Sequence, residues 1–87
     1  MKSGHYVYIL LTVDNTLYCG YTTDVEKRFQ AHLKGKGAKY TKVHKPLKIV
    51  YTKCFPTKSD ALKEECRIKN LKRIQKLNLI NSSVTQM

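Results

Sequence analysis

Residues 5–22 read HYVYILLTVDNTLYCGYT, and this stretch decides the fold. Tyrosine, leucine and β-branched residues dominate positions 5–11 and 17–22, which is typical of β-strands. The Asp-Asn-Thr sequence at 14–16 has the composition of a turn. The sequence therefore predicts a β-hairpin at the start of the domain.

The residues after the hairpin predict an amphipathic helix. An apolar residue recurs at every fourth position from 25 to 33, Thr23 or Asp24 can cap the start, and Gly35 lies just past the end. The apolar stripe consists of Val25, Phe29 and Leu33. We expect this stripe to face the core.

The second half of the chain adds one strand and two helices. Residues 35–46 are rich in lysine and glycine and should form a surface loop with at most a short turn. Residues 47–55 resume a β pattern, Thr57 begins a capping-box sequence for a helix that runs through Leu71, and a further helical run covers 74–80. The order β-β-α-β-α-α predicts an α+β fold, a three-stranded and largely antiparallel sheet flanked by helices.

A chain of 87 residues has room for one domain with one modest core. We assign residues 1–81 to this domain and residues 82–87 to a polar C-terminal tail. No stretch approaches the roughly 20 apolar residues that span a membrane. The three cysteines form no CxxC pair, which favours reduced thiols over a disulfide framework or a zinc site, and we expect a cytoplasmic protein.

The charge balance indicates a polyanionic partner. The chain carries 17 Lys and Arg against 6 Asp and Glu, a net charge of +11. Counterion release would favour binding to nucleic acid, which is the leading candidate. A solvated basic surface, a ribosome-associated protein or a membrane-surface protein would give the same balance.

Glu65 is the most informative acidic residue. Helical spacing places it in the apolar stripe that includes Ala61 and Ile68, whereas Glu64 points about 100° away and should be solvated. A carboxylate in that stripe must meet a cation, bind a metal or take up a proton, because burying it unpaired costs several kcal/mol. A salt bridge to Arg28 or to a nearby lysine is the structural alternative.

Arg28 and His32 lie four residues apart, so they share one side of the first helix and should border its apolar stripe. A guanidinium can hold a phosphate by two hydrogen bonds and stabilise the charge that develops during phosphoryl transfer. His32 could act as acid, base or phosphate donor near neutral pH. A surface arginine and a structural histidine are the plainer interpretations.

Tyrosines are concentrated in the hairpin. Strand alternation places Tyr6 and Tyr8 on one face and sends Tyr18 and Tyr21 to opposite faces. Tyrosine is an ordinary strand residue, but in a cationic cleft a phenol can orient or deprotonate an attacking water, or stack on a base.

Ten Lys and Arg and no Asp or Glu occupy residues 27–58. Such a segment can offer ammonium groups and backbone N–H groups to phosphates, although it lacks the spacing of a P-loop, and a merely solvated loop is the alternative. The candidate nucleic-acid contacts are Lys34, Lys36, Lys39, Tyr40, Thr41 and Lys42.

Two strand motifs, Tyr6-Val7-Tyr8 and Tyr18-Cys19-Gly20, followed by Arg28 and Glu65 on helices, resemble the signature of the GIY-YIG nucleases. The similarity extends to about residue 80 and is greatest to the small stand-alone members. Tyr6 stands at the family's first glycine, Val7 at its isoleucine, and Cys19 at the isoleucine of the second motif.

The resemblance implies a nuclease with low sequence specificity that cuts nucleic acid, DNA more readily than RNA, with one divalent cation, Mg²⁺ or Mn²⁺. It implies Glu65 as metal ligand, Arg28 as phosphate contact, Tyr8 as the general base and Tyr18 as its hydrogen-bonded partner. His32 would be a second phosphate contact or a proton carrier. A late asparagine serves in many members, and Asn70, Asn78 and Asn81 are all candidates.

Two other functions fit the same residues. The chain could be a non-catalytic nucleic-acid-binding module, or a structural protein of a ribonucleoprotein particle. Either would need the basic surface but no glutamate in an apolar stripe. We expect a monomer, with a protein partner as an additional source of specificity.

Overall fold

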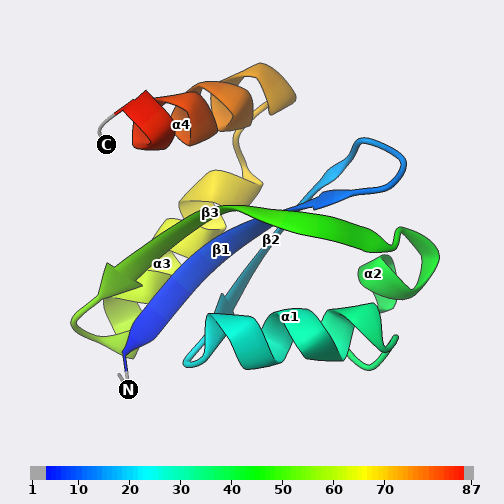
Figure 1. Cartoon of the computed structure of the whole chain (residues 1–87). Helices are drawn as coiled ribbons and strands as arrows, with labels where there is room; N and C mark the ends of the chain where they lie inside the picture. Colours follow the sequence, from blue (N-terminus) through cyan, green and yellow to red (C-terminus); the bar gives the residue numbers. More distant parts are fainter. Residues whose placement is uncertain (1–3, 86–87) are drawn as a thin grey trace.

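The computed structural model describes residues 4–85 and contains one three-stranded sheet with four helices (Figure 1). Its elements are β1 (His5–Thr12), β2 (Leu17–Thr22), α1 (Val25–Leu33), α2 (Lys39–Val43), β3 (Pro46–Phe55), α3 (Lys58–Lys69) and α4 (Arg73–Thr85). The strand order is β2-β1-β3, and both pairs are antiparallel. The predicted α+β class and the predicted order of the main elements are confirmed.

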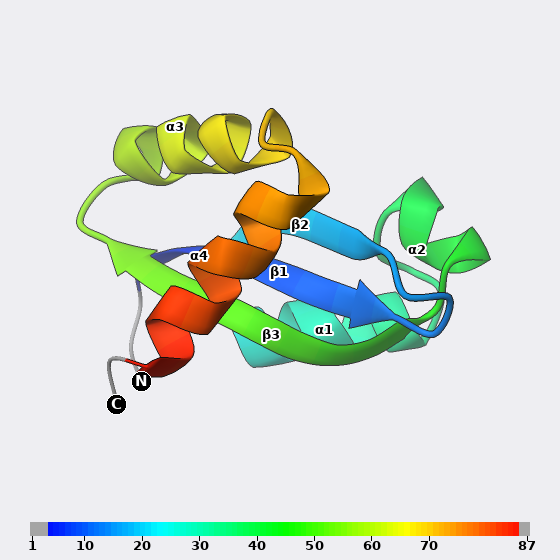
Figure 2. The same ribbon diagram turned by 90° about the horizontal axis from the view of Figure 1, so that it is seen from above.

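The sheet has helices on both faces. In Figure 1, α1 lies below the sheet and α4 above it; Figure 2, seen from above, shows α4 in front of the sheet and α1 behind it. Ala61 and Ile68 of α3 belong to the core on the α4 side. This core also contains Val7, Ile9 and Tyr51, together with Cys19, while residues of α4 pack against it. Because successive side chains of a strand alternate between faces, the even-numbered residues of β1 turn toward α1.

The local signals for the element ends are borne out. Asp24 caps α1 by accepting a hydrogen bond from the Lys27 backbone N–H, and Thr57 caps α3 by accepting one from the Asp60 N–H. Gly35 follows α1 with φ of +76°, a conformation that glycine adopts without a steric penalty.

Three sequence expectations differ from the structure. The lysine-rich segment contains the short helix α2, and α4 continues through the predicted polar tail as far as Thr85, while residues 86–87 lie outside the described part. On α1 the stripe is rotated: Leu33 is 46% exposed, and His32, expected at the border of the core, is 1% exposed. The rotation is possible because both ring nitrogens of His32 find hydrogen-bond partners.

No helix in residues 4–85 has the length and apolar character needed to cross a bilayer.

Candidate active site

A chain of buried hydrogen bonds links β1, α1 and α2. The Tyr8 hydroxyl lies 2.8 Å from His32 Nε2, and His32 Nδ1 lies 2.7 Å from Thr41 Oγ1. Thr41 Oγ1 donates in turn to the Ala38 carbonyl over 2.9 Å. All three side chains are about 1% exposed. Removing the Thr41 hydroxyl would leave a buried imidazole N–H unpaired, at a cost of about 1–3 kcal/mol.

The chain of bonds has one consistent direction. The single hydroxyl hydrogen of Thr41 is given to Ala38, so Thr41 Oγ1 accepts a hydrogen bond from His32 Nδ1–H. Burial, followed by the nearby charge of Arg28, lowers the pKa of His32, so its imidazole is neutral at neutral pH. Nε2 is then the acceptor, and the Tyr8 hydroxyl donates to it.

Two glycines make room for the Tyr8 and His32 rings of this hydrogen-bond chain. Gly20 is the cross-strand partner of Tyr8, and a Cβ on it would lie 2.5 Å from the Tyr8 hydroxyl oxygen. A Cβ on Gly37 would lie 2.1 Å from His32 Nδ1. The glycine of the second strand motif is therefore required for close approach of the phenol, and the glycine of the lysine-rich segment for close approach of the imidazole.

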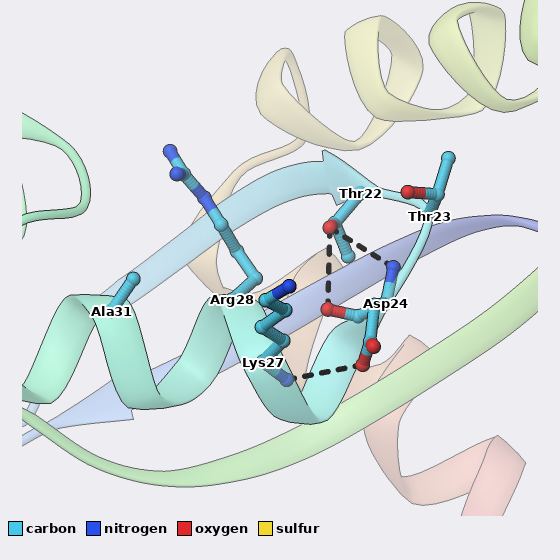
Figure 3. A pocket seen from close by; sticks show the side chains of 6 residues that line it. All are labelled: Thr22, Thr23, Asp24, Lys27, Arg28 and Ala31. Atoms are coloured by element: carbon cyan, nitrogen blue, oxygen red, sulfur yellow. Dashed lines mark hydrogen bonds between the residues drawn. The ribbon is translucent and has the colours of Figure 1, made fainter.

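Arg28 lies beside Tyr8 and His32. Burial raises the pKa of Tyr8 to about 12, and the Arg28 guanidinium partly opposes this rise. Arg28 lines a pocket of about 240 Å³ together with Lys27 and Thr23. Figure 3 shows these side chains, with the Asp24 carboxylate turned to the Lys27 backbone N–H. A phosphate placed here would meet Arg28 at the edge of the tyrosine cluster, the group of rings formed by Tyr8, Tyr18, Tyr40 and His32.

Tyr18 joins the cluster through ring contacts. Its ring lies edge-on to His32 at 5.3 Å between centroids and stacks on Tyr40 at 5.7 Å. The ring of Tyr8 is 6.4 Å away, but the hydrogen bond from Tyr8 goes to His32. The expectation that Tyr18 is the hydrogen-bonded partner of Tyr8 is therefore wrong, because the buried imidazole occupies that position.

Glu65 lies on α3, on the other side of the sheet. Its carboxylate is 3.3 Å from Lys69 Nζ, with 18% of the Glu65 side chain exposed. It also lies near Cys19 of β2: burial, and then the charge of Glu65, raise the pKa of the Cys19 thiol to about 12. The structural alternative of an ion pair with a lysine is thus realised with Lys69. Glu64, expected in solvent, is also half-buried, because it accepts two hydrogen bonds from Arg67.

The position of β2 in the sheet determines where Glu65 lies relative to the tyrosine cluster. β2 is an edge strand, and its neighbouring residues Tyr18 and Cys19 point to opposite faces. Tyr18 belongs to the cluster on the α1 side, and Cys19 lies in the core beneath α3. Glu65 and the cluster therefore flank the two faces of one edge strand.

The donor groups suit a metal site that the substrate completes. Residues 4–85 contain no group of three or more His, Cys, Asp or Glu side chains that could hold an ion. One carboxylate is nevertheless a known arrangement for Mg²⁺, which keeps several waters and takes further ligands from substrate phosphates. Glu65 fits such a site, and we expect weak affinity without nucleic acid.

The basic segment presents side chains more than backbone groups. The N–H groups of Lys34, Gly35 and Lys36 all donate to carbonyls of the last turns of α1, so they are not free to bind phosphate as the sequence suggested. Lys34, Lys36, Lys39 and Lys42 are exposed. Thr41 lies beneath the surface with its hydroxyl already engaged, and Tyr40 is partly exposed.

A second polar cluster holds α2 against the hairpin turn. The Asp14 carboxylate pairs with His44 Nδ1 and accepts a hydrogen bond of 2.5 Å from the buried Thr12 hydroxyl. His44 stacks on Tyr40 at 4.4 Å, and Tyr40 stacks on Tyr18. The Asp14–His44 pair therefore connects the turn to the tyrosine cluster through three stacked rings.

The Asp14–His44 pair makes stability depend on pH. Hydrogen bonds from Thr12 and then His44 lower the pKa of Asp14 from 3.8 to about 2. A lowered pKa contributes stability above about pH 4 that is lost as the pH falls toward 2. Asp14→Asn should therefore unfold at a lower temperature than the wild type at pH 6, and thermal melts should show the difference shrinking between pH 4 and 2. Glu26→Gln controls for loss of one exposed carboxylate, and a difference independent of pH would contradict the assignment.

Comparison with known proteins decides the family. The sequence profile of the GIY-YIG catalytic domain matches residues 4–78. The chain belongs to the GIY-YIG family. The match spans β1 and β2, which carry the two strand motifs that resemble the family's signature, as well as Arg28 on α1 and Glu65 on α3.

Relatives of this GIY-YIG domain include small bacterial proteins of similar length. A UPF0213 protein of Oceanobacillus iheyensis is 52% identical over 80 residues, 92% of this chain and 93% of the relative. A UPF0213 protein of Staphylococcus haemolyticus is 53% identical over 76 residues, 87% of this chain and 93% of the relative.

Two solved structures have the same fold. The solution NMR structure of a protein from E. faecalis has a TM-score of 0.67 with 38% identity and covers 97% of this chain and 90% of its own. That of a UPF0213 protein from Bacillus halodurans has a TM-score of 0.59 with 46% identity and covers 90% and 83% respectively.

Several features of this GIY-YIG domain carried no sequence signal. The sequence predicts Thr41 only as a nucleic-acid contact, and nothing in its spacing indicates a bond to His32 nine residues away. The Asp14–His44 pair joins positions 30 residues apart. Of the late asparagines, Asn70 ends α3 and donates its side-chain amide to the Cys66 carbonyl, which is a capping role, while Asn78 and Asn81 are exposed on α4.

Proposed function

We propose that this GIY-YIG domain is a divalent-metal-dependent endonuclease that hydrolyses phosphodiester bonds of nucleic acid, with DNA favoured over RNA and low sequence specificity. The supporting observation is the directed hydrogen-bond chain from Tyr8 through His32 to Thr41, placed beside Arg28. A binding module has no need of a buried phenol that donates to a neutral imidazole.

Tyr8 and His32 would act together as the base. At neutral pH a phenol with a pKa of about 12 is almost wholly protonated, so Tyr8 alone is a poor base. It becomes effective if it gives its own proton to His32 Nε2 while it accepts a proton from the attacking water. The resulting imidazolium would lie near Arg28, and their repulsion would favour later return of the proton.

Arg28 and Glu65 would act on the phosphate. The Arg28 guanidinium would hold non-bridging oxygens and stabilise the charge that develops on them. Glu65, on the other face of β2, would hold the cation at the strand edge. A bound Mg²⁺ or Mn²⁺ supplies Lewis-acid polarisation of the phosphate and stabilises the leaving oxygen.

The proposal is tested with end-labelled DNA and RNA substrates, single-stranded, double-stranded, branched and nicked, in Mg²⁺, Mn²⁺ or EDTA. We expect endonucleolytic cleavage of at least one substrate in metal and none in EDTA. Absence of cleavage across the panel, with binding intact, would instead support a non-catalytic binding module. The Glu65–Lys69 ion pair is the observation that favours this alternative, because it gives the carboxylate a purely structural role.

The exposed lysines should set affinity more than rate. Replacing Lys36 and Lys39 with alanine ought to weaken nucleic-acid binding and reduce the salt dependence of the binding constant by up to about 0.9 in log–log slope per lost phosphate contact. Binding titrations at several salt concentrations measure this slope. Lys63→Ala/Lys72→Ala, with the same loss of charge on α3 and the segment after it, is the matched control. A slope that stays at the wild-type value would remove Lys36 and Lys39 from the binding surface.

A further inference from the structure

A small pocket opens between the end of α1 and α2. Its volume is about 140 Å³, well below the roughly 300–1,000 Å³ of pockets that enclose drug-sized ligands. Lys34, Lys42 and Lys45 line it, together with the buried side chains of His32 and Thr41. Its size therefore suits a single small group.

The charge in this pocket has no counterion among the described residues. The ion pairs of residues 4–85 use Asp14, Glu64 and Glu65, and their basic partners are His44, Arg67 and Lys69. The sequence from 27 to 58 holds no acidic residue at all. Asp14, whose carboxylate pairs with His44 just after α2, is engaged by His44 and Thr12. The three lysines that line the pocket thus have no carboxylate partner among the described residues.

We propose that this pocket is a phosphate subsite, which takes a backbone phosphate next to the one that is cut. Three ammonium groups can surround one tetrahedral oxyanion, and the exposed lysine side chains can close on it. That the phosphate belongs to the substrate rests on the proposed function, whereas binding of the oxyanion does not.

The subsite adjoins the candidate active site through His32. One nitrogen of this ring accepts the bond from Tyr8, and the other donates to Thr41, which also lines the pocket. Gly37 packs against the same ring, where a Cβ would lie 2.1 Å from Nδ1. A strand whose scissile phosphate meets Arg28 would thus place a neighbouring phosphate on the Lys42 side of the imidazole.

The first experiment is an NMR titration of the full chain with inorganic phosphate against chloride at equal ionic strength. We expect saturable shifts at the Gly35 and Lys42 amides and at the His32 ring. These shifts should be lost in Lys42→Ala/Lys45→Ala but kept in Lys63→Ala/Lys72→Ala, which removes the same charge elsewhere.

The second experiment measures nucleic-acid binding against salt with the same two variants. Lys42→Ala/Lys45→Ala should lower the log–log slope by about 0.9 more than the control variant, the value for one phosphate. Saturable phosphate binding with an unchanged slope would identify a free-phosphate site and overturn the substrate assignment, and diffuse shifts in both variants with an unchanged slope would overturn the pocket altogether. If both results hold but no substrate is cut, the subsite stands and the nuclease function fails.

Discussion

Replacing Arg28 with alanine is expected to lower the rate of cleavage by about 10²-fold or more, while nucleic-acid affinity changes little. Arg28 is one cation among 17, so its share of the non-specific attraction is small. Its position beside Tyr8 and His32, however, places its charge where negative charge would develop on the phosphate. Single-turnover rates and binding constants, measured on the same protein, separate the two effects.

Two further variants sharpen the Arg28 test. Lys27→Ala removes a neighbouring charge at the same pocket and should weaken binding without a comparable loss of rate. Arg28→Lys keeps the charge but loses the planar pair of donors, so only partial recovery of the rate is expected. If Arg28→Ala lowers affinity and rate by the same factor, or lowers affinity while the rate stays at the wild-type value, Arg28 is an ordinary phosphate contact.

The fold could be predicted because local patterns and tertiary packing agree. The alternation in β1 and β2, the turn at Asn15 and the caps at Asp24 and Thr57 all act within a few residues of one another. The short helix α2 has no recognisable sequence pattern, because five residues give too few turns for a periodic signal.

The site was only partly predictable for a physical reason. Sequence spacing places Arg28 and His32 on one side of α1, but it cannot show that His32 is buried. That burial depends on hydrogen bonds to other elements: Tyr8 of β1 donates to the imidazole, and Thr41 of α2 accepts from it. Leu33 is apolar and His32 is polar, yet Leu33 is exposed, because the hydrogen-bonded imidazole of His32 takes the inner position. The role of Glu65 likewise depends on the edge position of β2, which spacing does not reveal.

Glu65→Gln should abolish metal-dependent cleavage and leave the fold intact. The amide keeps the shape of the side chain but lacks the charge that a hard cation requires. The ion pair that it removes joins Glu65 to Lys69, whose side chain is 53% exposed, so the loss should be about 0.4 kcal/mol, or about 2 °C in melting temperature. Nucleic-acid binding should persist in metal-free buffer. Lys69→Ala breaks the same ion pair while leaving the carboxylate, and should retain metal-dependent cleavage.

The cleavage rate of folded Glu65→Gln in Mg²⁺ or Mn²⁺, compared with that of the wild type on the same labelled substrate, tests the central claim most directly. The proposed mechanism predicts wild-type cleavage that EDTA stops and no cleavage above background by the variant, at equal folded fraction and comparable affinity. A folded Glu65→Gln protein that cuts at the wild-type rate would contradict Glu65 as the metal ligand and, with it, the metal-dependent mechanism proposed for this domain.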